Sequence, residues 1–193
     1  MADQEQPQRH GAGRAEECCA HAAAAAGHRT SPGRAEADLR GHLQLATEND
    51  GLTPWCGPAA VALATGRPYA AACDLLRSIA PAWYPEDGPI VTAYWRDLLA
   101  ALRDAGVPFD PIEVPEPRPT LLRLVRGGAL EPGGWYLLRV TDHFLLLRNH
   151  GFGVATLHDN RHTGVLVTGR THGRRRVTHL ARLLGGPLLV EPA

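Results

Sequence analysis

The most reactive side chain that this sequence offers is a cysteine at the start of a short apolar segment. Cys56 lies within residues 53–60, and the small apolar residues that follow it predict a buried helix ending near Gly66. Pro58 suits the first turn, where its missing N–H has no intrahelical partner. The free N–H groups and the helix dipole at that end favour the thiolate, the form that attacks a carbonyl. A lone cysteine is also often a small buried hydrophobic residue, so a catalytic role requires a base near the sulfur.

Ten histidines compete for the role of that base, and the strand pattern selects His143. Residues 149–153 separate two apolar runs and predict the turn of a β-hairpin. A hairpin centred on the middle of this turn places His143 directly opposite Asp159. The Asp159 carboxylate would orient the imidazole and favour its charged form. A one-residue change of register would bring Asn160 or His158 opposite His143 instead.

These residues are carried by predicted helices in the first half of the domain and predicted strands in the second. Helical periodicity predicts helices over residues 59–65, 69–79, 92–105 and 121–126. Apolar runs predict strands over residues 135–140, 143–149, 153–159, 165–168 and 175–180, with an edge strand or loose end at 188–190. Residues 108–119 are punctuated by proline and are expected to be an irregular connector. This order indicates an α+β fold with separate helical and antiparallel sheet layers.

The composition predicts a soluble globular protein without a nucleic-acid partner. The chain has 193 residues, of which 44% are hydrophobic, and its 20 acidic residues balance its 20 basic residues. No apolar run is long enough to cross a bilayer, so we expect no membrane partner. The polar N-terminus lacks a signal-peptide pattern, and four cysteines form no disulfide framework. We therefore expect a cytoplasmic protein, and a monomer.

Residues 1–40 are predicted to form a flexible low-complexity tail, and residues 41–193 the functional domain. The tail has no large apolar residue between Met1 and Leu39, so it cannot bury enough surface to offset the entropy of ordering. Its potential metal ligands include two adjacent cysteines, which do not match the paired spacing of zinc sites (Cys18, Cys19, His21 and His28). We predict no metal and no cofactor.

With a cysteine at a helix start, a histidine opening a strand and an acid after the next strand, the sequence resembles the papain-like cysteine peptidase superfamily. The resemblance covers about residues 43–180 and is carried by Cys56-Gly57-Pro58-Ala59, His143-Phe144-Leu145-Leu146 and Asp159-Asn160. It is nearest to the small bacterial branch that includes the peptidases cutting double-glycine leader peptides. It implies a papain-like fold, in which a helical layer carrying the cysteine helix packs on the antiparallel sheet.

The resemblance also implies an activity and a role for each matching residue. The protein would be a thiol hydrolase that cleaves peptide or amide bonds of a peptide or protein substrate by acyl transfer through a thioester. Cys56 would be the nucleophile, His143 the general base and acid, and Asp159 the residue that orients His143.

The same resemblance indicates residues around the nucleophile that would contact substrate. The family has an amide side chain, usually Gln, six residues before the cysteine, where it stabilises the oxyanion. Asp50 stands at that distance here, so we expect Asn49 to supply the amide. Trp55 and Gly57 are expected to border the substrate, Gly57 because it leaves room beside the sulfur.

Two other interpretations remain open at this stage. The missing Gln motivates the first, a catalytically inactive papain-like domain that binds a peptide or protein. A basic stretch motivates the second, a binder of nucleic acid or another anionic partner (Arg170, His172, Arg174, Arg175 and Arg176). Alternation along a strand would divide those arginines between two faces, so we do not expect the second.

Overall fold

The structure is a computed structural model that describes residues 40–188. Within this range the helices are α2 (His42–Glu48), α3 (Cys56–Thr65), α4 (Tyr69–Ile79), α5 (Trp95–Asp104) and α6 (Leu121–Arg126). The strands are β1 (Phe109–Ile112), β2 (Trp135–Val140), β3 (His143–Gly151), β4 (Val154–His158), β5 (Val165–Leu166) and β6 (Val177–Leu183). The expected tail and the segment 188–190 lie, apart from Arg40 and Leu188, outside the described residues. The predicted α+β class is confirmed.

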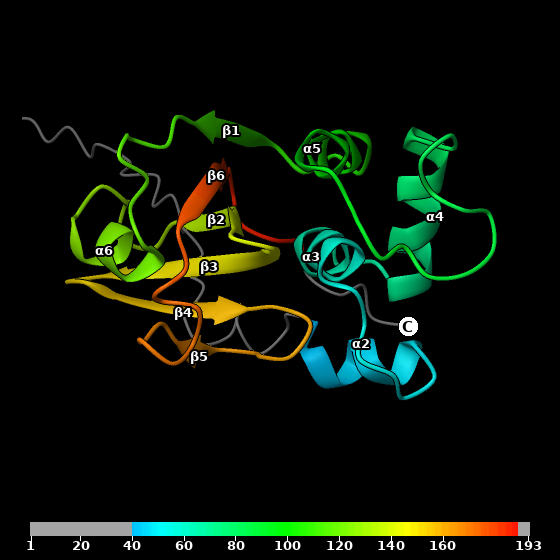
Figure 1. Ribbon diagram of the computed structural model, residues 1–193, viewed down its shortest axis with the longest axis horizontal. Coiled ribbons are helices and arrows are strands. Elements are labelled where there is room, and N and C mark those ends of the chain that lie inside the picture. The colour runs from blue at the N-terminus through cyan, green and yellow to red at the C-terminus, as the bar shows by residue number, and fades with distance from the viewer. Residues whose placement is uncertain (1–39, 189–193) are drawn as a thin grey trace, which may run out of the picture. The chain divides into compact units, whose positions relative to one another are not determined.

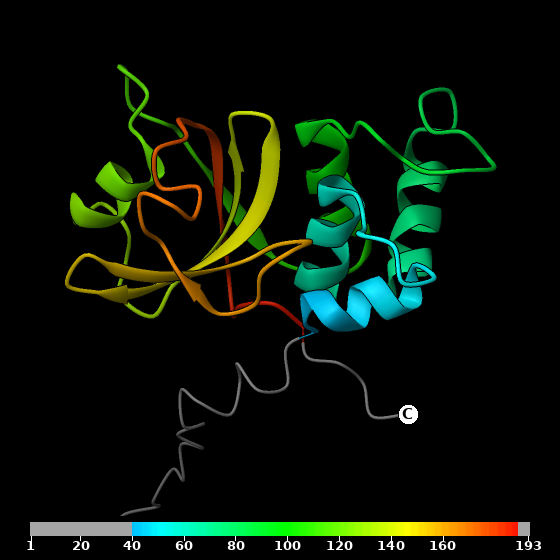
Figure 2. The same cartoon turned by 60° about the horizontal axis from the view of Figure 1, so that its bottom comes forward.

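All six strands belong to one antiparallel sheet in the order β1-β6-β2-β3-β4-β5 (Figure 1). The long central pairings join β6 to β2 and β2 to β3, and β2 and β3 are almost wholly buried. Such near-continuous apolar strands are expected where both faces of a sheet are covered. Figure 2 shows helices α2 to α5 gathered on one side of the sheet, with α6 at the other side.

The hydrophobic core is divided between the two faces of the sheet. One cluster joins α3, α4 and α5 to inward-facing sheet residues that include Leu137, Phe144 and Leu146. The second joins α6 to the alternate residues of the same strands, including Leu138, Leu145 and Leu147. This division follows from strand geometry, because successive side chains point to opposite faces.

Helix α3 lies between the other helices and the sheet, which explains its composition. Every residue from Gly57 to Thr65 is buried, and small side chains on all sides of the helix allow α4, α5 and β3 to approach it. Gly66 ends the helix with φ 68°, a left-handed conformation that suits glycine. The first residue of α3 is Cys56, which is therefore directed toward the end of the sheet.

One segment differs from the sequence-based expectation, and one helix lies outside the predicted elements. Residues 108–119, predicted to be irregular, contain β1, which pairs with β6 at the edge of the sheet. Pro111 is compatible with that position because an edge strand does not need every N–H for pairing. That helix is α2, which precedes Cys56 in the chain and whose only buried residue is Leu45.

The β3–β4 hairpin has a different register from the predicted one. Leu146 pairs with His158, and a bulge at Gly151 precedes a two-residue turn whose central residues, Phe152 and Gly153, have φ of 51° and 75°. Two positive φ values give the turn a twist that matches the strands, and this displaces the hairpin centre by one residue. Continuing the ladder places Asp159 opposite position 145, on the same face as His143 but diagonal to it.

No helix within residues 40–188 is both long enough and apolar enough to cross a membrane.

Candidate active site

Cys56 is the first residue of α3 and is half-buried. Its thiol is hydrogen-bonded to the His143 side chain and to the backbone N–H of Phe144, across the boundary between α3 and β3. Burial alone would raise the pKa of the thiol, but these hydrogen bonds and the positive charge of His143 lower it. The site therefore favours a thiolate.

His143 opens β3, immediately after the two-residue turn that follows β2. Its Nε2 lies 2.9 Å from Asp159 Oδ2, which leaves Nδ1 to face the Cys56 sulfur. Burial alone would lower the pKa of His143, whereas its bonds to Asp159 and Cys56 raise that pKa to about 9. The charged form of the imidazole is thus favoured between the Cys56 thiol and the Asp159 carboxylate.

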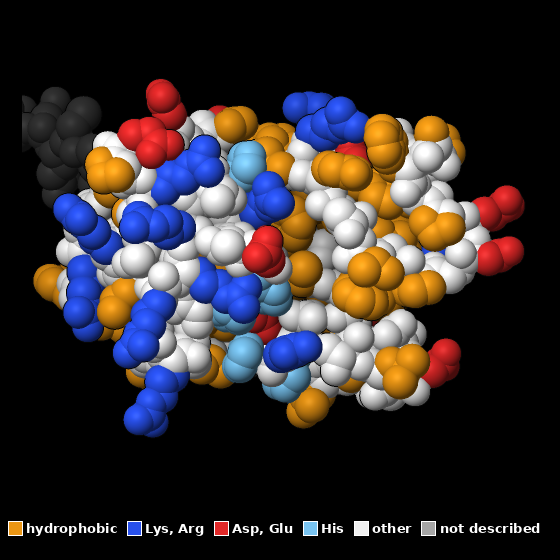
Figure 3. Space-filling model, in the orientation of Figure 1, with side chains coloured by type: hydrophobic (Ala, Val, Ile, Leu, Met, Phe, Trp, Pro, Cys, Tyr) orange, Lys and Arg blue, Asp and Glu red, His pale blue; other side chains and the backbone are white. Residues whose placement is uncertain are grey.

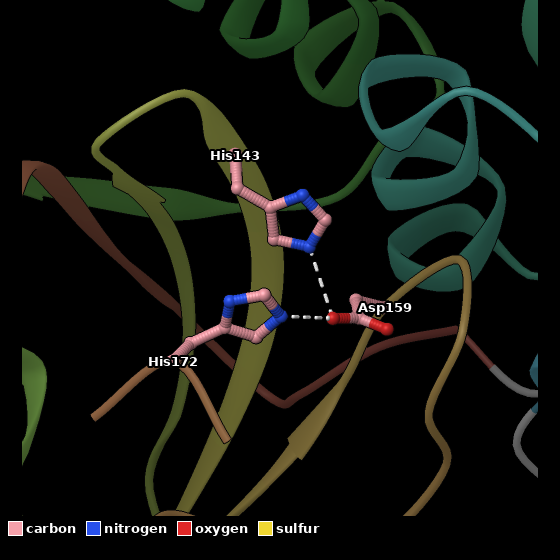
Figure 4. Close-up of side chains that lie close together, drawn as sticks. All are labelled: His143, Asp159 and His172. Carbon is pink, nitrogen blue, oxygen red and sulfur yellow. Dashed lines mark hydrogen bonds and ion pairs between the residues drawn. The ribbon is translucent and has the colours of Figure 1, made fainter. Parts of the chain in front are cut away.

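Asp159 follows β4 directly and is 1% exposed. Oδ1 accepts from the backbone N–H groups of Arg161 and His162, both at 2.8 Å, and lies 3.0 Å from His162 Nδ1. Oδ2 accepts from His143 and from His172 Nε2, at 3.0 Å (Figure 4). Burial alone would raise the pKa of this carboxyl, but the donors around it hold its pKa well below the usual range. Asp159 is thus a buried anion, and both of its oxygens accept hydrogen bonds from the protein.

Sequence reasoning missed His172 and His162 as partners of Asp159. His172 lies in the loop between β5 and β6, and its ring stacks on that of His143 with centroids 4.4 Å apart. A turn in an arginine-rich stretch carries no local signal for this contact. The three-residue spacing of His162 from Asp159 is the only signal that would have suggested either.

The ligand atoms of His143, Asp159 and His172 all lie within 4.8 Å of one another, a spacing that a metal ion could bridge. However, both Nε2 atoms point at the same Asp159 oxygen and lie at hydrogen-bond distance from it. We therefore interpret the group as hydrogen bonds focused on one carboxylate.

Trp55 and Asn49 were both expected to lie near the Cys56 sulfur, and their surroundings in the structure differ. Trp55 caps α3, is 41% exposed and borders a cavity of ≈ 600 Å³. Asn49 also borders that cavity, but its amide nitrogen donates to the Leu52 carbonyl oxygen at 3.1 Å. The amide expected beside the sulfur is therefore held within its own loop.

Gly57 has a packing role that the sequence did not predict. It is buried, and a Cβ built on it would lie 2.4 Å from the Cβ of Ala93. The absent side chain therefore admits the segment before α5, rather than opening space for a substrate beside the sulfur. That Gly57 borders the substrate stays a prediction.

Asn160, the alternative partner for His143, instead joins the sheet to the loop before the nucleophile. Its amide nitrogen donates to the Pro54 carbonyl oxygen at 2.6 Å. This bond connects the residue after Asp159 with the residue two positions before Cys56. The loop and the hairpin are thereby held together beside the thiol.

The type of side chain exposed around these residues differs between the sheet layer and the helical layer. Figure 3 shows arginines concentrated over the sheet and α6, hydrophobic side chains over the helices, and histidines between them. The helical side includes several exposed large apolar residues (Leu52, Trp55, Trp83, Val91 and Tyr94).

The chain matches no known family model, and no curated protein and no solved structure is found to be similar to it.

Proposed function

We propose that this protein is a papain-like thiol hydrolase that cleaves a peptide or amide bond by Cys-His-Asp acyl transfer. The observation that carries the proposal is the continuous hydrogen-bonded line from the Cys56 sulfur through His143 to Asp159. A nucleophile, a base in contact with it and a third group that orients the base are the parts that nucleophilic catalysis requires. An α+β arrangement with the cysteine at a helix start supports the papain-like assignment.

The reaction begins with attack of the Cys56 thiolate on the carbonyl carbon, which places negative charge on the carbonyl oxygen. The backbone N–H of Cys56 faces the sulfur and is a donor for that oxyanion. When the tetrahedral species collapses, the C–N bond breaks and His143 gives the ring proton from Nδ1 to the departing amine. His143 then accepts a proton from water as the water attacks the thioester. The C–S bond breaks, the carboxylic acid product is released, and Cys56 and His143 return to their starting state.

Asp159 keeps His143 in the orientation that both proton transfers need. The carboxylate is held by backbone N–H groups, so it does not follow the ring when the ring loses its charge. Its negative charge stabilises the imidazolium of the resting ion pair. Asp159 itself transfers no proton.

The cavity beside Trp55 is our candidate for a substrate subsite. It lies on the helical side, next to the residue that precedes the nucleophile, and Tyr69 in its lining accepts a hydrogen bond from the Trp55 N–H at 3.0 Å. Its wall includes Leu52, Trp55 and Pro89. We expect it to receive an apolar side chain of a peptide or protein substrate.

The proposal is tested with a peptidyl epoxide, an electrophile that reacts with thiolates, on the full-length chain. Peptide-resolved mass spectrometry separates labelling of Cys56 from that of the other cysteines. We expect Cys56 to react about a hundredfold faster than Cys73, and Cys56→Ser to abolish cleavage of a mixture of unstructured peptides while Cys73→Ser retains it. Equally slow labelling of Cys56 and Cys73 would overturn the proposal.

The placement of Asn49 favours a second candidate function, a catalytically inactive papain-like domain that binds a peptide or protein. Because the Asn49 amide is engaged by Leu52, the second oxyanion donor expected in the family is not directed at the sulfur. Loss of one such donor costs about a hundred- to a thousandfold in rate. Peptide binding that persists in Cys56→Ser, with no cleavage by the unsubstituted protein, would favour this function.

A further inference from the structure

His172 contacts both polar residues that lie behind the nucleophile. Its Nε2 lies 3.0 Å from Asp159 Oδ2, and its ring stacks on that of His143 at an interplanar angle of 21° (Figure 4). The side chain is 15% exposed, so most of it is enclosed by these contacts. His172 thus touches the proposed base and the residue that orients it, but not the sulfur.

The two oxygens of Asp159 have different closest donors. Oδ1 is fixed by the backbone of the same turn, through the N–H groups of Arg161 and His162. Oδ2 accepts its two shortest hydrogen bonds from the Nε2 atoms of His143 and His172. His162 Nδ1 also lies 3.2 Å from Oδ2, so when the His143 ring moves during proton transfer, His172 supplies the shorter of the two hydrogen bonds that remain on this oxygen.

The backbone at His172 is held in a conformation that histidine seldom adopts. Its φ is 57°, in the left-handed region that favours glycine. The turn is fixed by backbone hydrogen bonds on both sides, from Arg175 N to the His172 carbonyl at 2.9 Å and from Gly173 N to Thr168 O at 3.0 Å. Such residues concentrate where a side chain must be presented in one direction.

From these three observations we propose that His172 is a positioning residue, which holds Asp159 by an N–H donor and the His143 ring by its stacked face. The proposal rests on the proposed function, because it assigns His172 a part in the same Cys-His-Asp relay. His172 acts on the nucleophile only through Asp159 and His143. Its removal should let the carboxylate and the His143 ring tilt apart, which lowers the fraction of Cys56 in the thiolate form.

The test is the rate of Cys56 alkylation by iodoacetamide as a function of pH, which needs no substrate. His172→Gln keeps an amide N–H near the position of Nε2, His172→Phe keeps a stacking ring without the donor, and His172→Ala removes both. His150→Ala is the matched control, since His150 is an exposed histidine at the far end of β3. Peptide-resolved mass spectrometry reads Cys56 and Cys73 in the same sample, and each protein is measured with and without a chelator.

We expect His172→Ala and His172→Phe to slow Cys56 alkylation at pH 6 by about tenfold, because a hydrogen bond to a buried charge is lost. His172→Gln should stay within about threefold of the unsubstituted protein, and His150→Ala should not change the rate. Cys73 alkylation should be the same in all of these proteins. A purely structural role would instead change the two cysteines together.

Three results would overturn the proposal. Equal Cys56 rates in all variants would mean that His172 does not act on the relay. A faster rate in His172→Ala would mean that His172 competes with His143 for the carboxylate. A slower rate on chelation of the unsubstituted protein would assign His172 to a metal instead. Because alkylation requires no turnover, a protein that cleaves no peptide can still confirm the positioning role.

A fourth variant separates this role from stability. Glycine adopts φ near 57° without strain, so His172→Gly should unfold at a higher temperature than His172→Ala. Its Cys56 alkylation should nevertheless be as slow as that of His172→Ala. Alkylation that recovers together with the unfolding temperature would show that His172 only stabilises the turn.

Discussion

Within residues 40–188 there are two free thiols, Cys56 and Cys73, and they lie in neighbouring helices with different surroundings. Cys56 is half-buried at the first residue of α3, and Cys73 is 7% exposed in the middle of α4. Burial raises the pKa of Cys73, to which Tyr69 is hydrogen-bonded. The same effect of burial acts on Cys56, yet the pKa of Cys56 is lowered.

The difference between the two cysteines comes from their neighbours. Cys56 faces an imidazole that is itself stabilised in its charged form by a buried carboxylate. Cys73 has a neutral phenol, Tyr69, and the positive charge of Arg77 nearby, and together they do not offset the effect of its burial. A helix start alone would give Cys56 only a modest advantage, because the dipole effect is small and falls off within a turn.

Replacing the imidazole should remove most of this difference. In His143→Gln the thiol of Cys56 keeps its desolvation but loses the cation, so its pKa should rise to the ordinary range or above. We expect Cys56 alkylation at pH 6 to fall about a hundredfold, and to approach the unsubstituted rate above pH 9.5. Cys73 in the same samples is the internal control. A Cys56 rate that is unchanged at pH 6 would contradict the ion pair.

Replacing the carboxylate should have a smaller effect with the same direction. Asp159→Asn keeps the shape but removes the charge, so the pKa of His143 should fall from about 9 toward its ordinary value. The equilibrium between thiolate–imidazolium and thiol–imidazole should shift toward the neutral pair by about tenfold. The measurement is the pH profile of Cys56 alkylation, whose acidic plateau should drop and whose basic limb should move to lower pH. A profile that does not move would mean that Asp159 only packs.

Local patterns were sufficient to predict the elements that position these residues. The predicted helices 69–79 and 121–126 and the predicted strand 135–140 agree with α4, α6 and β2, because their periodicity is set by neighbours in sequence. Strand β1 was missed because Pro111 within it argues against a strand, and because its partner β6 lies some 70 residues later. Pairing between distant segments depends on the whole fold, which a local pattern does not encode.

Local patterns were also sufficient to select the main residues of the candidate site, but not their exact pairing. Cys56, His143 and Asp159 each begin an element or directly follow one, so the predicted ends of helices and strands were enough to select them. The hairpin register was not predictable because Phe152, rather than a glycine, takes a positive φ in the turn. The prediction nevertheless kept His143 and Asp159 on one face, because the register moved by two positions and preserved the alternation of side chains. His172 was unpredictable, because a loop contact across 13 residues leaves no pattern.

The two pKa shifts at the ion pair make opposite contributions to the pH dependence of stability. The raised pKa of His143 gives stability that is complete below about pH 6.5 and is lost as pH rises through about 9. The lowered pKa of Cys56 gives stability that is complete above its unfolded value of about 8.5 and is lost as pH falls. The two contributions therefore have pH slopes of opposite sign and partly cancel.

Removing the thiol should expose the contribution of the histidine. In Cys56→Ala the raised pKa of His143 remains through Asp159, so the free energy of unfolding should fall by about 1 kcal/mol between pH 6.5 and 8.5. The measurement is urea unfolding at several pH values, with Cys73→Ala as the control for losing a thiol. If the free energy of unfolding changed with pH in the same way for Cys56→Ala and the unsubstituted protein, the two pKa shifts would not offset each other.

The smallest effect is expected from the second thiol. Cys73 borders the cavity beside Trp55 and contacts Tyr69, whose hydroxyl accepts the Trp55 N–H, so it lies two contacts away from the nucleophile. Cys73→Ala leaves the His143–Asp159 pair intact, and we expect Cys56 alkylation at pH 6 to change less than about twofold. A change as large as that from Asp159→Asn would mean that Tyr69 transmits the state of Cys73 to the nucleophile. The contrast between the two cysteines would then depend on their coupling as well as on their neighbours.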